Sequence, residues 1–195
     1  MSQVYANGTF VSSNKSIFEV VQLNAAESHI GEIGGRIIIP TATFTRPSNT
    51  TAYVSGQLIA NSVTAGSVTP MSITAARAND KSGLIRKASV RVNNIIWLNA
   101  TVRVHLFSAL PTVTNGDGGT FLPSEASWIG SIDVSLTNQF SNPAVKGNGS
   151  PNVGGEINFV PAAGTQLLYA LLEARSAVTP GSGDVFVVGL ESHQN

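Results

Sequence analysis

Hydrophobic and polar residues alternate with the period of a β-strand in two stretches near the middle of the chain, residues 83–92 and 101–107. The apolar positions are Ala88, Val90 and Val92 in the first stretch, and Val102, Val104 and Leu106 in the second. Because side chains alternate between faces along a strand, each stretch predicts a strand with one buried and one solvent-facing side. We expect residues 83–110 to form a hairpin, with Trp97 folded over its end.

Further strand-like stretches lie on both sides of this region and are separated by segments rich in Gly, Pro, Asn and Ser. They cover residues 36–44, 53–61, 71–76, 128–136, 156–160, 167–175 and 184–191. In residues 128–136 we expect one buried face made of Trp128, Ile132, Val134 and Leu136. Leu and Ala in residues 166–178 also suit a helix. The turn sequence TPGSGD that follows favours a strand paired with residues 184–191.

These patterns predict eight or nine strands without the alternation of strands and helices that marks a parallel sheet. We therefore expect an all-β protein, a two-sheet antiparallel β-sandwich of jelly-roll type. The sandwich would occupy residues 36–195 and follow an N-terminal arm of residues 1–35.

The arm carries apolar side chains without an evident core of its own. These are Tyr5, Phe10, Ile17, Phe18, Val20, Val21 and Leu23. Residues 15–23 fit a short helix or a strand, and three nearby glycines (31, 34 and 35) would act as a joint. Soluble monomers avoid leaving such a segment exposed, so we expect these seven residues to contact another subunit or partner surface.

The composition narrows the range of partners. Charged residues make up 11% of the chain, its net charge is zero and it contains no cysteine. A neutral chain does not suit nucleic acid or an anionic membrane, because both select basic patches. The absence of cysteine excludes disulfides and thiolate metal sites. The N-terminal sequence lacks the features of a signal peptide and no apolar run is long enough to span a membrane, so we expect synthesis in a cytoplasm.

Candidate chemical groups are few. His29, His105 and His193 are far apart in the sequence, and we interpret His105 as a polar surface or interface residue. Asp117, Asp133 and Asp184 could pair as acid catalysts only through folding. The NGDGG sequence at residues 115–119 resembles part of a calcium loop, but lacks a further acidic ligand and predicts a turn. We find no cofactor motif and expect the protein not to be an enzyme.

Two groups of residues leave alternatives open. Arg86, Lys87, Arg91 and Arg103 would lie near one another on the hairpin, either as a docking patch for an acidic partner or as a solvated sheet face. Aromatic residues could form a sugar-binding platform, although a core needs them and is the preferred interpretation. They are Tyr53, Trp97, Phe107, Phe121 and Trp128.

Three segments resemble tailed-phage virion proteins. Residues 43–62 contain an R-P-x-x-T-T-x-Y motif followed by G-x-[LV]-[IV]-x-N, and residues 102–121 are similar to R-x-H-L-[FY]-x-x-x-P-T-x-x-[ND]-x-[DG]. The C-terminal residues resemble L-Y-[AG]-x-[LV] followed by [TP]-x-[SG]-[GA]-x-x-F-x-V-x-L. The resemblance spans residues 43–195, and it implies a head decoration (cement) protein with a jelly-roll sandwich.

On this basis we expect a non-enzymatic structural protein, made in the host bacterial cytoplasm and located on the capsid surface of the virion. Its partners would be the major capsid protein and further copies of itself, as a trimer or dimer, but neither nucleic acid nor membrane. The alternative is a receptor- or carbohydrate-binding β-sandwich module of a tail fibre.

Overall fold

The computed structural model describes residues 4–6, 9–11 and 36–194, with side chains in the last range. The chain divides into two compact units, Met1–Gly35 and Arg36–Asn195. In the first unit β1 (Val4–Ala6) pairs with β2 (Thr9–Val11) in an antiparallel manner. The helix or strand expected at residues 15–23 and the glycine joint lie outside the described residues.

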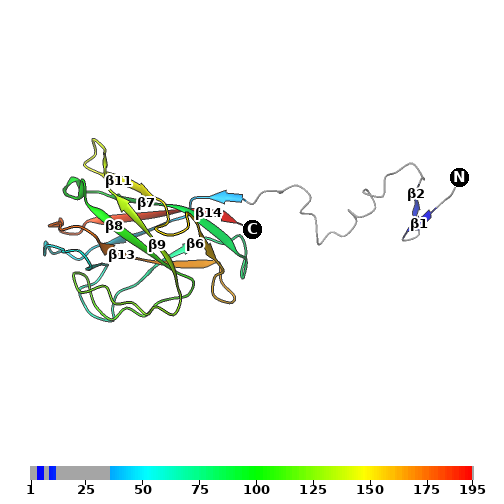
Figure 1. The fold of residues 1–195 in the computed structure, drawn as a ribbon, viewed down its shortest axis with the longest axis horizontal. Helices are drawn as coiled ribbons and strands as arrows, with labels where there is room; N and C mark the ends of the chain where they lie inside the picture. Colours follow the sequence, from blue (N-terminus) through cyan, green and yellow to red (C-terminus); the bar gives the residue numbers. More distant parts are fainter. Residues whose placement is uncertain (1–3, 7–8, 12–35, 195) are drawn as a thin grey trace. The chain divides into compact units, whose positions relative to one another are not determined.

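The second unit is built from two antiparallel sheets, which confirms the all-β prediction (Figure 1). One sheet contains β3 (Arg36–Ile38), β4 (Thr41–Thr45), β7 (Gly83–Val92), β10 (Asn138–Gln139), β11 (Val145–Gly149), β12 (Ile157–Phe159) and β14 (Val185–Gln194). The other contains β5 (Leu58–Ile59), β6 (Met71–Thr74), β8 (Thr101–Phe107), β9 (Trp128–Ser135) and β13 (Leu167–Ala174). A short 3-10 helix, Ile95–Trp97, connects β7 to β8.

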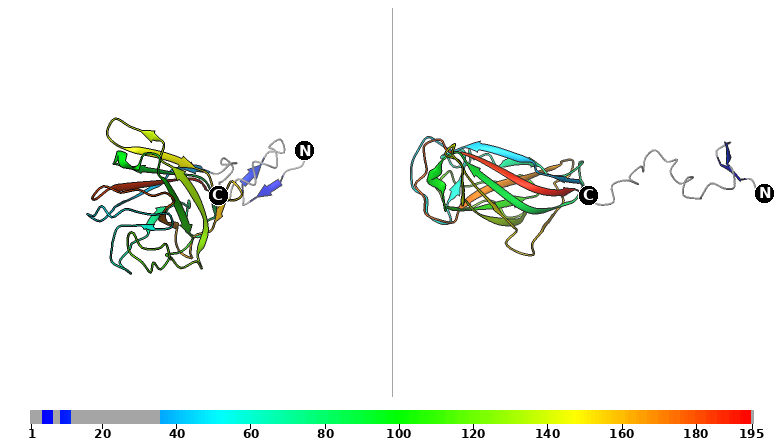
Figure 2. Two further views of the ribbon diagram at one scale, coloured as in Figure 1. Left: turned by 60° about the vertical axis from the view of Figure 1, so that its left-hand side comes forward. Right: turned by 90° about the horizontal axis from the view of Figure 1, so that it is seen from above.

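Strand pairing brings together segments that are distant in the sequence. In the first sheet β14 lies between β7 and the successive strands β3 and β4, while β11 and β12 pair with the other edge of β7. In the second sheet β13 lies between β8 and the strands β5 and β6, and β9 lies beyond β8. The strands form two layers around one core, an arrangement compatible with a β-sandwich (Figure 2).

The prediction of two hairpins, one in residues 83–110 and one joining residues 167–175 to 184–191, is wrong. β7 and β8 belong to different sheets, and so do β13 and β14. The connection after β7 is not a tight turn, because the Asn94 side chain accepts a hydrogen bond from the Ile96 N–H and caps the 3-10 helix. This helix places Trp97, which is fully buried, inside the protein instead of over a hairpin end. Alternation shows which face of a strand is buried, but it does not identify the strand's neighbour.

The main core contains all but one of the residues that the alternating pattern placed on buried faces, and Trp128 is the exception. The others have 0% exposure and come from both sheets: Ala88, Val90, Val92, Val102, Val104, Leu106, Ile132, Val134 and Leu136. Complete burial of one such side chain contributes about 1.5–3 kcal/mol. Their apolar contacts therefore hold the two layers together.

A smaller apolar cluster covers the outer side of the second sheet. It consists of Leu58, Ala60, Phe107, Val113 and Leu171, with Val68, Phe121 and Tyr169 packed against it. Loop residues 111–123 contribute Val113 and Phe121 to this layer. Part of the outer face of the sheet is consequently buried under loops rather than exposed to water.

Trp128 is not on the buried face where the sequence pattern placed it. The β8–β9 register pairs Leu106 with Gly130 but Phe107 with Trp128, so Ile129 is an extra residue in a β-bulge. A bulge moves the side chains before it to the opposite face of the strand. As a result Trp128 is 49% exposed.

β10 and β11 lie in residues 137–155, between two expected strands, where the sequence predicted none. β11 packs against β9 of the other sheet, and a Cβ added to Gly147 or Gly149 would lie 2.1 or 2.0 Å from the carbonyl oxygen of Ser135 or Asp133. Glycine is therefore required there, although it is unusual in strands. Past β11, Asn152 bonds to the edge of β9: its N–H donates to the Ser131 oxygen, and its Oδ1 accepts the Asp133 N–H.

Candidate functional site

Two of the seven residues predicted to contact a partner, Tyr5 and Phe10, lie in the described strands β1 and β2. Tyr5 in β1 is the register partner of Phe10 in β2. Ile17, Phe18, Val20, Val21 and Leu23 lie outside the described residues. Their role in partner contact stays a prediction.

The predicted basic patch is divided between the two sheets. Arg103 lies on β8 and makes two hydrogen bonds to the Asp133 carboxylate, at 2.6 and 2.8 Å. Arg86 pairs with Glu156 at 2.8 Å, and Lys87 lies 3.7 Å from a Glu191 oxygen. The expectation that these cations form one patch on a hairpin is therefore wrong, since β7 and β8 are not neighbours.

Arg91 has a different environment, because its neighbour on β11 is another cation. Arg91 and Lys146 are directly opposite in register, and the same row continues through Val187 on β14 to Thr43 on β4. Within the described residues, neither cation has a carboxylate at ion-pair distance. Like charges in directly opposite positions repel each other. We call the outward surface of Lys146, Arg91, Val187 and Thr43 the cationic row.

The motif residues of the N-terminal half meet in one buried network around Arg46. Its guanidinium donates to the Tyr53 hydroxyl, to an Asp117 oxygen at 2.9 Å and to the Gly181 carbonyl at 3.0 Å. Arg46 also lies over the Tyr53 ring at 4.8 Å, and the side chains of Arg46 and Asp117 are 0% and 2% exposed. Burial raises the pKa of the Tyr53 phenol, with the Asp117 carboxylate adding to the effect.

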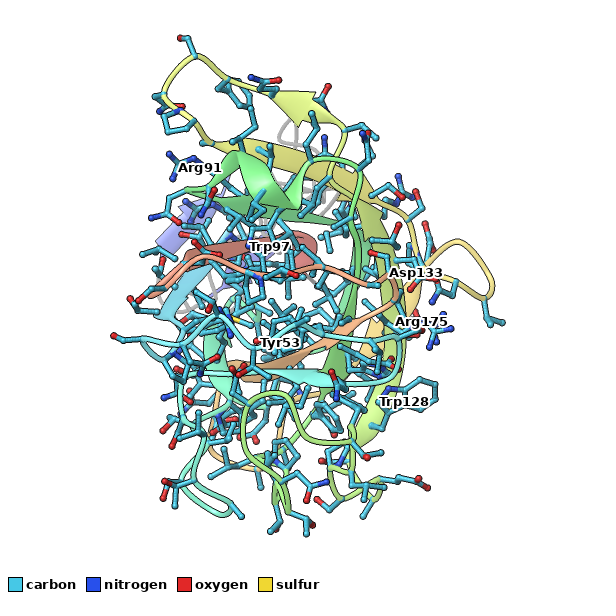
Figure 3. The ribbon with its side chains drawn as sticks, turned by 90° about the vertical axis from the view of Figure 1, so that its left-hand side faces the viewer. Tyr53, Arg91, Trp97, Trp128, Asp133 and Arg175 are labelled. Carbon is cyan, nitrogen blue, oxygen red and sulfur yellow. The ribbon has the colours of Figure 1, made fainter. Side chains whose placement is uncertain are left out.

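Asp184 extends the buried network toward the core aromatics. Its carboxylate accepts hydrogen bonds from the Trp97 indole at 2.7 Å, the Asn94 amide at 2.9 Å and the Gly181 N–H at 2.7 Å. Figure 3 shows Tyr53 and Trp97 in the interior of the body. Among the described residues, every buried polar side-chain atom has a hydrogen-bond partner. The polar atoms of the network are therefore all hydrogen-bonded, and these bonds connect loops that are distant in the sequence.

Asp117 does not lie in a metal-binding arrangement. One of its oxygens accepts the Ala60 N–H at 2.8 Å and the other binds Arg46, so both oxygens are used by the fold. In the part of the chain with described side chains, no three His, Asp or Glu residues gather as metal ligands. No helix there is long and apolar enough to cross a membrane. His29 lies outside the described residues, and His193 lies 3.3 Å from a Glu191 oxygen.

His105 lies at the centre of a chain of side chains on the outer face of the second sheet. Its Nε2 is 2.8 Å from a Glu173 oxygen, and the other Glu173 oxygen accepts from Arg175 at 3.0 Å. The Trp128 indole donates to His105 Nδ1 at 3.3 Å. An indole nitrogen can only donate, so Nδ1 is the acceptor and the imidazole proton lies on Nε2, toward Glu173. We call this set the Trp128 relay.

The electrostatics of the relay agree with a neutral imidazole. Burial of the His105 ring lowers its pKa, and this effect exceeds the opposing effect of the Glu173 carboxylate. The His105–Glu173 contact is therefore a hydrogen bond rather than an ion pair. In contrast, the hydrogen bonds from Arg103 hold the pKa of Asp133 below its usual value.

Two hollows lie beside Trp128. One, of about 340 Å³, is lined by His105, Phe107, Phe121, Leu122, Pro123, Glu125 and Trp128. The other, of about 460 Å³, is lined by Trp128, Ile129, Gly130, Ser131, Asn152, Val153, Glu156, Ile157 and Asn158. Figure 3 shows the Trp128 ring projecting from the body on the side that carries Asp133 and Arg175. Trp128 thus separates two depressions of one surface.

The five aromatic residues considered as a sugar platform have different positions. Tyr53, Trp97 and Phe107 are core residues, at most 1% exposed. Phe121 is half-buried and stacks on His105, with 4.2 Å between ring centroids. Trp128 alone among these five is exposed. A partial sequence signal was present, since Gly130 interrupts the alternating pattern two residues after Trp128, at the bulge.

No protein-family model and no curated protein matches this chain.

Proposed function

We propose that this chain is a non-enzymatic structural protein of a tailed phage, which decorates or cements the exterior of the capsid. It acts by associating with further copies of itself and with the major capsid protein. Three observations support the proposal. Three motif segments that are distant in the sequence meet at one buried site, and the strand order fits a jelly roll. In addition, Arg91 and Lys146 have no carboxylate partner among the described residues.

The meeting of three distant motif segments carries the proposal. Arg46 and Tyr53 come from the first segment that resembles virion proteins, Asp117 from the second and Gly181 from the third. All four belong to the buried network. Chance matches at separate places in a sequence would have no reason to converge on one buried site. The convergence supports a family resemblance based on a shared scaffold.

The strand order supports a jelly roll as the finer description of the fold. Reading across the layers gives β4-β14-β7-β11 in one sheet and β6-β13-β8-β9 in the other. When these eight strands are followed along the chain, most successive strands lie in different sheets, as two Greek keys wound together require. The jelly roll is one of the architectures common among viral capsid proteins.

The cationic row supplies a surface suited to an acidic partner. Arg91 and Lys146 repel each other in the isolated body, and neighbouring rows carry small side chains such as Ser89 and Thr41. A carboxylate from a partner would relieve that repulsion, and a flat face of small side chains allows close approach. We assign this row and the arm, residues 1–35, as the surfaces used in association.

Co-sedimentation with purified undecorated heads tests the proposal. The full-length protein should bind, a variant lacking residues 1–30 should bind poorly, and Arg91→Glu or Lys146→Glu should each weaken binding at least tenfold. Lys81→Glu, an exposed charge change away from the row, is the matched control and should bind normally. If the full-length protein does not bind heads, the decoration role is wrong. If the truncated protein binds as well as full length, the arm has no part in it.

A further inference from the structure

The Trp128 relay holds an exposed ring in one orientation. A half-exposed tryptophan usually has several rotamers available in water, but the indole N–H of Trp128 is bound to His105. His105 is itself restrained by Glu173 and by stacking on Phe121. Arg175 in turn binds Glu173, which is 7% exposed. The ring therefore avoids much of the entropy loss that fixing a free side chain on binding would cost.

Polar groups without a protein partner flank the ring on both sides. Glu125 lines the smaller hollow and Asn158 the larger one, and both are exposed. Among the described residues, neither side chain makes a hydrogen bond or ion pair. Trp128 thus presents an apolar ring between a free carboxylate and a free amide.

We propose that the Trp128 surface is a binding site for glycans, in which a pyranose ring packs on the indole. A sugar ring has an apolar face of C–H groups and an edge of hydroxyl groups, which matches an aromatic plane flanked by Glu125 and Asn158. The volumes of the two hollows, about 340 and 460 Å³, lie in the range of small-ligand sites. Hydroxyl groups would donate to Glu125 and exchange hydrogen bonds with Asn158.

A protein anchor fits this surface less well. An apolar side chain inserted beside Trp128 would bury the Glu125 carboxylate or the Asn158 amide without a partner, which is unfavourable. Trp128 lies on the second sheet, and Asn158, on β12 of the first sheet, pairs with Leu84, seven residues along β7 from Arg91 of the cationic row. Glycan binding is thus separable from the proposed attachment to capsids, and it would suit a virion protein on a head or on a tail fibre.

The full-length protein should be tested on an array of oligosaccharides with glucose, galactose, mannose, rhamnose and N-acetylglucosamine termini. Each positive glycan should then be titrated against wild type and variants by calorimetry. Trp128→Ala should weaken binding at least tenfold. Phe140→Ala removes another exposed aromatic ring, 47% exposed and absent from both hollows, and should leave the affinity unchanged.

A second comparison separates a glycan site from a protein anchor. Trp128→Ala should keep wild-type co-sedimentation with heads, so failure of this inference and failure of the decoration role give different results. The inference is overturned if no glycan on the array binds, or if Trp128→Ala binds glycans as tightly as wild type. It is equally overturned if that variant loses head binding while no glycan binds.

Discussion

The indole N–H of Trp128 donates to Nδ1 of His105 over 3.3 Å, and this contact joins the bulged end of β9 to the neighbouring strand β8. Because the indole cannot accept a hydrogen bond, it is compatible only with an imidazole whose Nδ1 is deprotonated. The protonation state of His105 is therefore linked to the position of an exposed aromatic ring.

This link predicts a pH dependence of stability. The pKa of His105 in the folded protein is below the usual value because the ring is buried. Below about pH 6.5 the unfolded chain binds a proton that the folded protein excludes, so stability falls as the pH decreases toward the folded pKa. Above pH 6.5 both states are neutral and this contribution is constant. Melting temperatures between pH 5 and 8 should show the loss.

The variant His105→Gln separates this effect from the protonation of carboxylates at lower pH. It should flatten the part of the profile just below pH 6.5. Identical slopes for His105→Gln and wild type would contradict the assignment.

Charge introduced into the main core should strongly destabilise the fold. Val104 is completely buried on β8, between the two layers. In Val104→Asp an unpaired carboxylate would replace a methyl-rich side chain, and we expect a loss of more than about 4 kcal/mol. Urea denaturation measures it. Thr43→Asp, at an exposed position of β4, is the control and should be near wild type; a stable Val104→Asp protein would show that the core is misassigned.

Removal of one partner from the buried ion pair should be severe. Arg46→Met leaves the Asp117 carboxylate buried with its charge uncompensated, and such losses amount to about 3–5 kcal/mol. Arg86→Met breaks the exposed pair with Glu156 and should cost about 0–1 kcal/mol. Equal losses for the two variants in chemical denaturation would mean that the buried network contributes little to the fold.

A side chain added at Gly147 or Gly149 should disrupt the close packing of β11 against β9. Gly147→Ala and Gly149→Ala would place a methyl group about 2 Å from a backbone oxygen of β9, so strands must separate. Overpacking of this kind costs about 1–3 kcal/mol. Asn148→Ala lies between them at an exposed position and should change the melting temperature little. Glycine variants as stable as wild type would disprove the close packing.

The sequence predicted the strands of the core well because burial on one face produces a simple period. It failed at places where the decisive interaction is not periodic. The bulge at Ile129 exposed Trp128, and the glycines of β11 concealed a strand whose packing depends on the absence of side chains. The exchange of strands between layers could not be inferred either, since a strand carries the same alternation whichever strand lies beside it.

The candidate site was predictable only in parts. The sequence identified His105 and Trp128 as residues of interest, but Glu173 and Arg175 lie 68 and 70 residues from His105 in the chain, and nothing local indicates their contact. Likewise, the motif around Arg46 was visible as a pattern, while its role in burying a charge required the positions of Asp117 and Gly181.

Asn152 has a consequence for crowded copies of this protein. An uncovered sheet edge is a template for intermolecular strand pairing and aggregation. Asn152 meets part of the β9 edge with its own backbone and side-chain amide, and the adjacent Pro151 has no N–H to offer an incoming strand. Copies held at high local concentration, as the proposed decoration of a capsid would require, would find this part of the edge already occupied. The protein can then be packed densely while fibre growth through β9 is suppressed.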